Sequence, residues 1–489
     1  MMTGLTKGRF MIPAFFFSIF LCLSMVAFAG DPNVRSAPAK NLNANDPNRY
    51  TKPFEENSLW KSRPVSPTFS DFVIPRSAFN PNIHQGTLSS GCFFADENSP
   101  PVTVKLNPGQ KGVYDADAEA FLPQVEIPHW PADVVPAPGG DGHADIFDVT
   151  NGVIHSFWKL RNNNGAWTAN LYAWSPINGS GWPDPAHYYH GARAVGVPAC
   201  AGIIRKHEFQ SSDTIYPHAL AMSLAQNGMG PGYVFPATSA DVFTKTNRGK
   251  IPEGSLVMLP PDFDTSKLKT PELVKIANTL KVYGAYIIDR NDGTPFIIYV
   301  ENGSGLNLNK NNYSQNLLIA NELHSIRDSL RMVNSVKSWL NEQGKPFTPE
   351  KNLNILSMRG PWCINRGSAC VRDDPSMGKF DTWKQAVVFA NTKTPVSQSN
   401  PSGRGISQVE WAKPKAGEKF KLTAKTSGGG KLRFIIRDKK WNTKIDSYNL
   451  ENDQSITFIW PKEDVVTYLY ATSGVGKSSS VSGTLVRVK

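Results

Sequence analysis

Polar and apolar residues alternate with a period of two along the C-terminal part of the chain. The clearest segments are EKFKLTAKT, KLRFIIRDKKW, SITFIWPK, VTYLYATS and SGTLVRVK. A period of two places alternate side chains on opposite faces of a strand, and the glycine-rich turns between these segments favour hairpins. We therefore predict a small antiparallel β-sandwich over residues 404–489.

The pattern over residues 54–344 predicts a second β-rich domain. Short apolar segments bounded by turn residues recur along it, among them ADIFDV, VIHSFWKL, AWTANLYAW, GSLVMLP, AYIIDR and FIIYVEN. One helix is expected where Thr270 can cap it and Pro271 suits its first position, followed by an apolar stripe that ends at Gly284. A second helix-like or mixed stretch ends at Gly344. Many strands with one or two peripheral helices predict a β-sandwich or jelly roll.

The N-terminus has the pattern of a secretory signal peptide over residues 1–29. Two basic residues, Lys7 and Arg9, precede a nearly all-apolar run that ends in AFA, a small-x-small cleavage site before Gly30. An uncleaved membrane anchor is the alternative. No later segment is long and apolar enough to span a bilayer. The mature chain is therefore expected to be exported, either secreted or periplasmic.

Two polar segments separate the predicted domains from the signal peptide and from each other. Residues 30–53 are poor in apolar side chains and are expected to form a flexible leader. Residues 345–403 are expected to be a connector that contains a disulfide and includes most of the soft sequence NTKTPVSQSNPSGRG, which is typical of a linker.

Four cysteines remain after removal of the signal peptide, an even number that suits disulfides in an oxidising compartment. Three pairings are possible on paper. Cys363 and Cys370 flank the polar loop INRGSA, so a local bridge is expected there, which leaves Cys92 to pair with Cys200. The spacing does not match a zinc knuckle. Neither a metal site nor a cofactor is expected.

Positive charge is concentrated at the C-terminal end. The chain has 52 Lys and Arg against 41 Asp and Glu, and residues 404–489 hold 16 basic and 8 acidic residues, a net charge of +8. Such a surface either keeps strand edges from aggregating or attracts a polyanion, such as an acidic polysaccharide or an anionic cell surface. Trp411, Trp441 and Trp460 could stack on sugar rings or belong to the core. No nucleic-acid-binding motif is present.

Several motifs of the central region occur in the same order in a known group of proteins. They are ENSLWKSRPVS, GDGH…HSFW, GVPACAGIIRKHEF…IYPHALAM, YVFPATSAD, IPEGSLVMLPPDFD and YGAYIIDRNDG. In these motifs, which span about Phe54 to Met332, the chain resembles a group of secreted bacterial β-rich extracellular proteins, often joined to carbohydrate-binding modules. The resemblance implies export and the extent of the central domain, and it implies no particular reaction.

Polar residues at predicted strand ends are the candidates for chemistry. His143 follows the GDG turn and opens a strand whose period places it on one face with Asp145 and Phe147. His218 leads another strand, and Asp289 ends the segment AYIID, where it could orient one of the two imidazoles. We predict His143, His218 and Asp289 as catalytic residues. The alternative is that each histidine is a buried structural residue.

Cationic and aromatic side chains of the same region are candidates for holding a sugar polymer. Arg161, Arg193 and Arg205 could bind acidic substituents, and Glu301 ends the strand FIIYVE. Four tryptophans could line a glycan groove or belong to the core: Trp158, Trp167, Trp174 and Trp182.

No familiar catalytic signature narrows the reaction. The chain lacks a G-x-S-x-G elbow, an H-E-x-x-H motif and a phosphate-binding loop. A glycosidase needs two placed carboxylates, for which Asp145, Asp289 and Glu301 are candidates, whereas a polysaccharide lyase needs a base and groups that offset the developing charge. The expectation is a secreted monomer that degrades an extracellular polysaccharide, which could be acidic. Non-catalytic glycan binding or cell-surface adhesion is the alternative.

Overall fold

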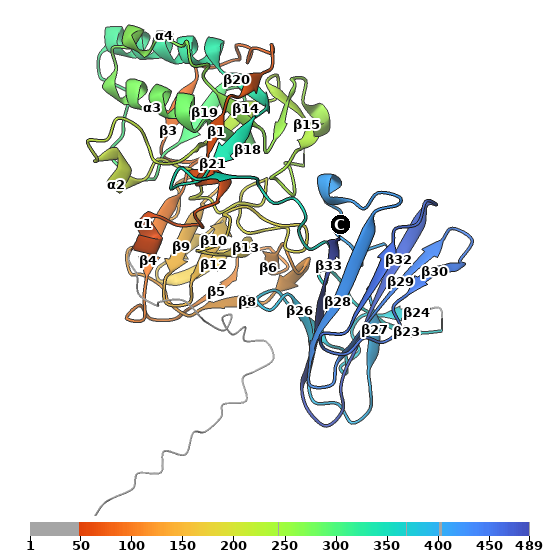
Figure 1. Cartoon of the computed structure of the whole chain (residues 1–489). Coiled ribbons are helices and arrows are strands. Elements are labelled where there is room, and N and C mark those ends of the chain that lie inside the picture. The colour runs from red at the N-terminus through yellow and green to blue at the C-terminus, as the bar shows by residue number, and fades with distance from the viewer. Residues whose placement is uncertain (1–47, 243, 368, 401–402, 489) are drawn as a thin grey trace, which may run out of the picture. The chain divides into compact units, whose positions relative to one another are not determined.

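The computed structural model of the chain describes residues 48–488 except 243, 368 and 401–402. The predicted signal peptide and residues 30–47 of the predicted leader lie outside this range. Strands dominate the described part, and helices are few (Figure 1). The prediction of a mainly β protein with β-sandwich architecture is therefore confirmed.

Two sheets of the central region share one hydrophobic core, which contains Trp130, Phe157 and Tyr172. The six-stranded sheet has the order β4 (Gly91–Ala95), β9 (Ala144–Asp148), β10 (Val153–Trp158), β13 (Leu171–Pro176), β6 (Val113–Asp115) and β7 (Ala120–Leu122). The four-stranded sheet has the order β11 (Arg161–Asn163), β12 (Ala166–Ala169), β5 (Val102–Leu106) and β8 (Gln124–Ile127). The two sheets therefore form a sandwich.

A seven-stranded sheet completes the central region. Its order is β2 (Thr68–Phe69), β20 (Arg331–Ser335), β17 (Leu256–Met258), β18 (Ala285–Asn291), β14 (Leu220–Ala225), β19 (Phe296–Tyr299) and β3 (Asn82–His84). One face packs on the helices α3 (Pro271–Val282) and α4 (Tyr313–Ser329) (Figure 1). The other face shares a core with the six-stranded sheet, because Tyr286 and Ile288 of β18 belong to the same cluster as Phe147 of β9.

Local signals located the first of these helices well. Thr270 is the N-cap of α3, Pro271 is its first residue, and Gly284 follows with a left-handed φ of 75°. The mixed stretch after it resolves into α4 and the strands β20 and β21 (Ser338–Leu340). Shorter pairings join β21 to β1 (Arg63–Val65) and β22 (Pro346–Phe347), and β15 (Met229–Tyr233) to β16 (Ile251–Glu253).

The C-terminal part is a sandwich of two sheets around a core that includes Phe420, Phe434 and Leu469. One sheet has the order β25 (Lys379–Asp381), β26 (Ala386–Phe389), β33 (Ser479–Arg487), β28 (Lys419–Ser427) and β31 (Ser455–Ile459). The other has the order β27 (Ser397–Ser399), β32 (Val465–Thr472), β29 (Lys431–Asp438) and β30 (Thr443–Asp446). The five alternating segments of the sequence correspond to β28, β29, β31, β32 and β33.

The C-terminal sandwich begins before residue 404. β25, β26 and β27 lie within residues 345–403, where the sequence indicates a connector and linker, and each pairs with a strand of the same sandwich or with its neighbour. Sheet hydrogen bonds join backbone groups, so a polar segment such as Ser397–Ser399 can pair as well as an apolar one. The end of the predicted flexible leader is also structured. Residues 48–53 contain α1 (Asn48–Thr51), and the hydroxyl of Tyr50 donates to the carbonyl of Cys92.

Both predicted disulfides are present. Cys92 of β4 is bonded to Cys200, and Cys363 is bonded to Cys370 across the hairpin of β23 (Ile364–Arg366) and β24 (Ala369–Val371). Within the described residues, no helix has the length and apolar character needed to cross a membrane.

Candidate functional site

Three of the predicted site residues form one cluster, in which Arg193 acts on both His143 and Asp289. Arg193 is buried, lies 4.4 Å from the centre of the Tyr299 ring, and donates from Nη1 to Oδ2 of Asp289 at 3.3 Å. His143 is buried as well and forms a backbone hydrogen bond with Phe157. Burial, together with the charge of Arg193, holds the pKa of His143 well below its ordinary value. His143 is therefore a neutral imidazole at physiological pH.

Asp289 is paired with an arginine in this cluster. Its carboxylate bonds Arg193 and the backbone N–H of Arg290, and no imidazole bonds it among the described residues. Burial raises the pKa of Asp289 to about 6. Nδ1 of His143 and both Nε and Nη2 of Arg193 are buried without a hydrogen-bond partner in the described part of the chain. The expected imidazole–carboxylate pair is thus replaced by a guanidinium–carboxylate pair.

His218 lies in a different cluster. Its Nε2 is 3.0 Å from Oε2 of Glu208 in α2 (Lys206–Phe209), and its Nδ1 bonds the carbonyl of Ala219. Arg205 bonds Oε2 of Glu301 at 3.0 Å. A cavity of about 200 Å³ touches Arg205, Glu208 and His218. The structure thus brings His218, Arg205 and Glu301 close together, while His143 and Asp289 belong to the group around Arg193.

Trp158 and Arg161 hold the GDG turn in place. Nε1 of Trp158 donates to Oδ1 of Asp141 at 3.3 Å. The guanidinium of Arg161 donates to the carbonyls of Gly139, Gly140 and Leu160 at 2.8 Å each. Trp158 is bonded to the carboxylate of Asp141, and Arg161 to backbone carbonyls, so both side chains serve the turn that precedes β9.

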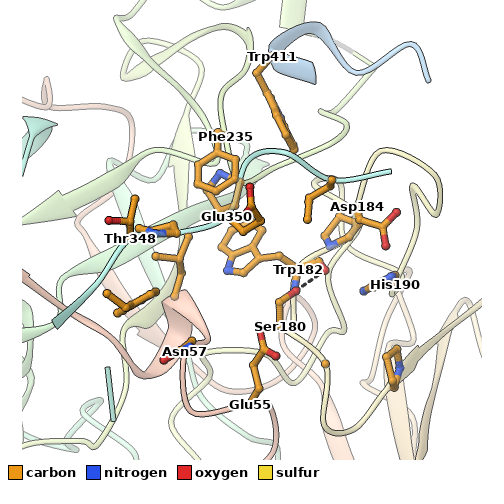
Figure 2. A pocket seen from close by; sticks show the side chains of 18 residues that line it. Glu55, Asn57, Ser180, Trp182, Asp184, His190, Phe235, Thr348, Glu350 and Trp411 are labelled. Atoms are coloured by element: carbon orange, nitrogen blue, oxygen red, sulfur yellow. Dashed lines mark hydrogen bonds between the residues drawn. The ribbon is translucent and has the colours of Figure 1, made fainter. Parts of the chain in front are cut away.

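A separate cavity of about 360 Å³ combines aromatic and carboxylate side chains (Figure 2). Its aromatic lining includes Trp182, Phe235 and Trp411, and it also contains His190 and three carboxylates, Glu55, Asp184 and Glu350. These residues come from the start of the central region, from loops after β13 and β15, from the connector and from the C-terminal sandwich. Tertiary folding alone brings them together.

The aromatic walls are fixed by neighbouring rings. Trp182 stacks on Trp60, with centroids 4.9 Å apart and planes 6° apart. Phe235 meets Trp411 edge to face at 5.0 Å, and Nε1 of Trp411 donates to the carbonyl of Ala237 at 2.6 Å. The cavity therefore presents preformed aromatic surfaces, which is typical of small-molecule sites.

The carboxylates differ in their environment. Oδ1 of Asp184 accepts the backbone N–H groups of Ala186 and His187, both at 2.8 Å. Burial outweighs these bonds and raises the pKa of Asp184 to about 6. Partial burial raises the pKa of Glu55 above its ordinary value, although Lys61 opposes the shift. Asp184 is therefore protonated at a higher pH than an ordinary aspartate.

A wider cavity of about 1000 Å³ continues from the first. The two share Leu59, Phe235, Pro236 and residues 347–350, so we call them together the central groove. Lys250, Lys337 and Lys351 line the wider end. One end of the central groove is therefore rich in carboxylates and the other in cations.

Sequence reasoning did not find the central groove. None of the eight side chains predicted for catalysis or substrate binding lines either of its cavities. Glu55, Asp184 and Glu350 lie in loops with no periodic pattern, and they are far apart in the sequence. A local signal exists only for Trp182 and Trp411, which the sequence suggests as surfaces for sugar rings and which line the first cavity.

No protein-family model matches the sequence, and no curated protein matches it. Partial structural likenesses exist. A glycosylation-associated protein complex from Streptococcus agalactiae aligns with 26% of this chain and 44% of its own, at 17% identity and a TM-score of 0.19. A carbohydrate-binding module bound to β-1,4-galactotriose aligns over 21% of this chain and 70% of its own, at 16% identity and a TM-score of 0.15. A fucose-binding module from Streptococcus pneumoniae aligns over 29% of this chain and 100% of its own, at 15% identity and a TM-score of 0.16.

Proposed function

We propose that the protein binds a carbohydrate in the central groove. The observation that carries this proposal is the presence of Phe235, Trp411 and three carboxylates in one cavity. The C–H groups on one side of a sugar ring pack against aromatic faces, and sugar hydroxyls donate to carboxylate oxygens. The carboxylate-rich end of the groove offers both kinds of contact.

An acidic polysaccharide suits both ends of the central groove. Lys250, Lys337 and Lys351 attract anionic sugar units to the wider cavity. Lys351 lies 4.7 Å above the ring of Phe235, so a cation and an aromatic surface meet where the two cavities join. A polysaccharide whose uronic acid units lie in the wider cavity would place its neutral units beside Glu55, Asp184 and Glu350.

Hydrolysis of the bound chain is a second candidate function. Asp184, whose pKa is raised to about 6 by burial, is suited to protonate a leaving oxygen. Glu55 and Glu350 line the same cavity and are candidates for the second carboxylate of a glycosidase. His143 and His218, which the sequence suggests as bases for a lyase, lie outside the groove.

The test combines binding and product assays on the full mature chain, with oligosaccharides of neutral and acidic polysaccharides as ligands. Phe235→Ala is expected to weaken binding by about tenfold, because it removes a central aromatic contact. Asp184→Asn is expected to bind as the wild type does and to release no reducing ends. The control is Phe79→Ala, an aromatic residue that is 63% exposed and lies outside the groove.

The outcomes separate the alternatives. New reducing ends without absorbance from unsaturated uronides support hydrolysis, and such absorbance supports a lyase instead. Binding without either product supports a non-catalytic glycan-binding protein. Equal affinities of Phe235→Ala, Phe79→Ala and the wild type would contradict the groove as the binding site.

A further inference from the structure

The two outer faces of the C-terminal sandwich carry different side chains. On the sheet that contains β28 and β33, alternate residues face outward, and they are lysines, serines and threonines: Lys419, Lys421, Lys425, Ser480, Ser482 and Thr484. Such a surface is well solvated and resists edge-to-edge aggregation. The solvated-surface explanation of the basic charge therefore suits this face.

The opposite outer face is aromatic. Arg433 and Tyr470 lie side by side in neighbouring strands, as do Ile435 and Tyr468. Trp441 follows β29 and Tyr448 follows β30, and these two residues are 66% and 73% exposed. We call this surface the aromatic face; it consists of Arg433, Arg437, Trp441, Tyr448, Tyr468 and Tyr470. Strands β29, β30 and β32, which carry or adjoin it, are drawn in blue in Figure 1.

Two of these aromatic residues, Trp441 and Tyr448, have an unusual backbone conformation. Trp441 has a φ of 68° and Tyr448 a φ of 52°, both in the left-handed region. Bulky side chains are disfavoured there, and such conformations cluster at binding sites. A surface whose role is only to stay solvated needs neither exposed aromatic rings nor a disfavoured backbone conformation. Trp441 and Tyr448 combine both features on one face.

Arg437 supplies a cation between the rings. Its guanidinium lies 5.9 Å from the centre of Trp441 and 5.7 Å from the centre of Tyr468, and these two rings are 6.1 Å apart. Nε of Arg437 is buried without a hydrogen-bond partner among the described residues. Arg433, by contrast, is paired with Asp446. Within the described part of the chain, Arg437 is thus the arginine of the aromatic face that has no carboxylate partner.

The surrounding charge favours an anion. Each of the eight acidic residues in 404–489 already forms an ion pair with a lysine or arginine of the same segment. The positive excess of this segment is therefore left without internal compensation, a charge distribution that attracts polyanions.

We propose that the aromatic face is a second carbohydrate site, which binds a polysaccharide containing uronic acids. Its sugar rings stack on Trp441 and the neighbouring tyrosines, tyrosine hydroxyls bond sugar hydroxyls, and a uronate carboxylate pairs with Arg437. This site does not depend on the central groove, since no residue of the aromatic face lines either cavity of the groove. Attachment through this face would raise the effective concentration of the polymer at the groove.

Affinity electrophoresis of the full mature chain tests the proposal, with polygalacturonate and alginate as acidic probes and galactan as the neutral one. The double variant Trp441→Ala with Tyr448→Ala removes the two exposed rings. It is expected to weaken binding of an acidic probe by about tenfold at about 0.15 M salt, a concentration that screens weak surface attraction. The matched control, Lys419→Ala with Lys421→Ala, removes two charges from the other face and is expected to change affinity by less than about twofold.

A single variant provides independent support. Arg437→Gln keeps the aromatic rings and removes the charge, so it is expected to weaken binding to polygalacturonate or alginate without affecting galactan. Three results would overturn the proposal: no acidic probe binds, the aromatic variant binds as tightly as the wild type, or the lysine control loses as much affinity as the aromatic variant. Phe235→Ala distinguishes the two sites. If the central groove binds no carbohydrate, Phe235→Ala changes nothing, whereas the variants of the aromatic face still lose affinity for the acidic probes.

Discussion

Buried ionisable residues of the central region are held by specific partners. Burial lowers the pKa of His218, but the attraction and hydrogen bond of Glu208 outweigh it, so the pKa of His218 is raised. Burial raises the pKa of Glu208, but His218 and neighbouring hydrogen bonds outweigh it, so the pKa of Glu208 is lowered. The two shifts describe one ion pair, with Nε2 and Oε2 3.0 Å apart. His218 therefore stabilises the fold in its charged form.

The pH dependence of stability follows from these directions. A raised pKa stabilises fully below the unfolded value for histidine, about 6.5, and the stabilisation is lost as pH rises through the folded value. A lowered pKa stabilises above the unfolded value for glutamate, about 4.3, and this is lost as pH falls through the folded value. The pair is therefore most stabilising between about pH 4.3 and 6.5.

His218→Gln is expected to reduce the free energy of unfolding by about 3 kcal/mol near pH 5.5, because it leaves Glu208 buried without its cation. Because this stabilisation is lost as pH rises through the folded pKa of His218, the loss is expected to be smaller near pH 9 than near pH 5.5. Urea denaturation at both pH values measures the difference. An equal loss at both would mean that the ring acts only through its neutral hydrogen bonds.

At the level of elements, the hairpin of β25 and β26 fastens the C-terminal sandwich to the central region. Its turn carries Trp383, which is buried in the core of the six-stranded and four-stranded sheets. The Trp383 ring stacks on Trp174 at 5.6 Å and lies 5.4 Å from His155. A second contact is Arg359, whose guanidinium lies 3.9 Å from the centre of the Tyr188 ring. Short elements of the predicted connector thus carry the contact between the two sandwiches.

Trp383→Ala is expected to lower the free energy of unfolding by about 3–5 kcal/mol, as removal of a large buried ring does. Because this ring joins two sandwiches, differential scanning calorimetry should show one transition for the wild type and two for the variant. The control is Trp441→Ala, which removes an exposed ring and should change stability by less than about 0.5 kcal/mol. A single, unshifted transition in Trp383→Ala would contradict the role of the hairpin.

At the level of the whole molecule, the two disulfides constrain very different lengths of chain. Cys92 and Cys200 are 108 residues apart, whereas Cys363 and Cys370 are 7 apart. Closing a longer loop removes more conformational entropy from the unfolded chain. The long bridge also lies in the core between the six-stranded and seven-stranded sheets, since Cys92 and Cys200 belong to that cluster.

Replacing both Cys92 and Cys200 by alanine is therefore expected to reduce stability by about 5 kcal/mol, and replacing Cys363 and Cys370 by about 2 kcal/mol. Thermal melting of the two double variants under identical conditions compares them. The ranking would be refuted by a larger loss for the short bridge, which would show that local geometry matters more than loop closure.

Local patterns were sufficient for much of the fold. The period-two segments correspond to β28, β29, β31, β32 and β33, and the capping residues before Leu273 mark the start of α3. The same period correctly placed Phe147 on one face of β9, where it faces the core shared with the seven-stranded sheet, while Ile146 faces the other core. These features follow from backbone geometry over a few residues, which each segment carries in its own sequence.

Tertiary structure alone decided which of these segments meet. The polar linker pairs as β27, Arg193 takes the position beside Asp289 that was expected for an imidazole, and Asp184 meets Phe235 and Trp411 in the central groove. The same amino-acid types are compatible with many partners, and the choice among them depends on how distant strands and loops pack. The sequence by itself therefore determined many of the elements and favoured the cysteine pairing that the structure shows. The sites became visible only in the folded chain, because long-range packing brings their residues together.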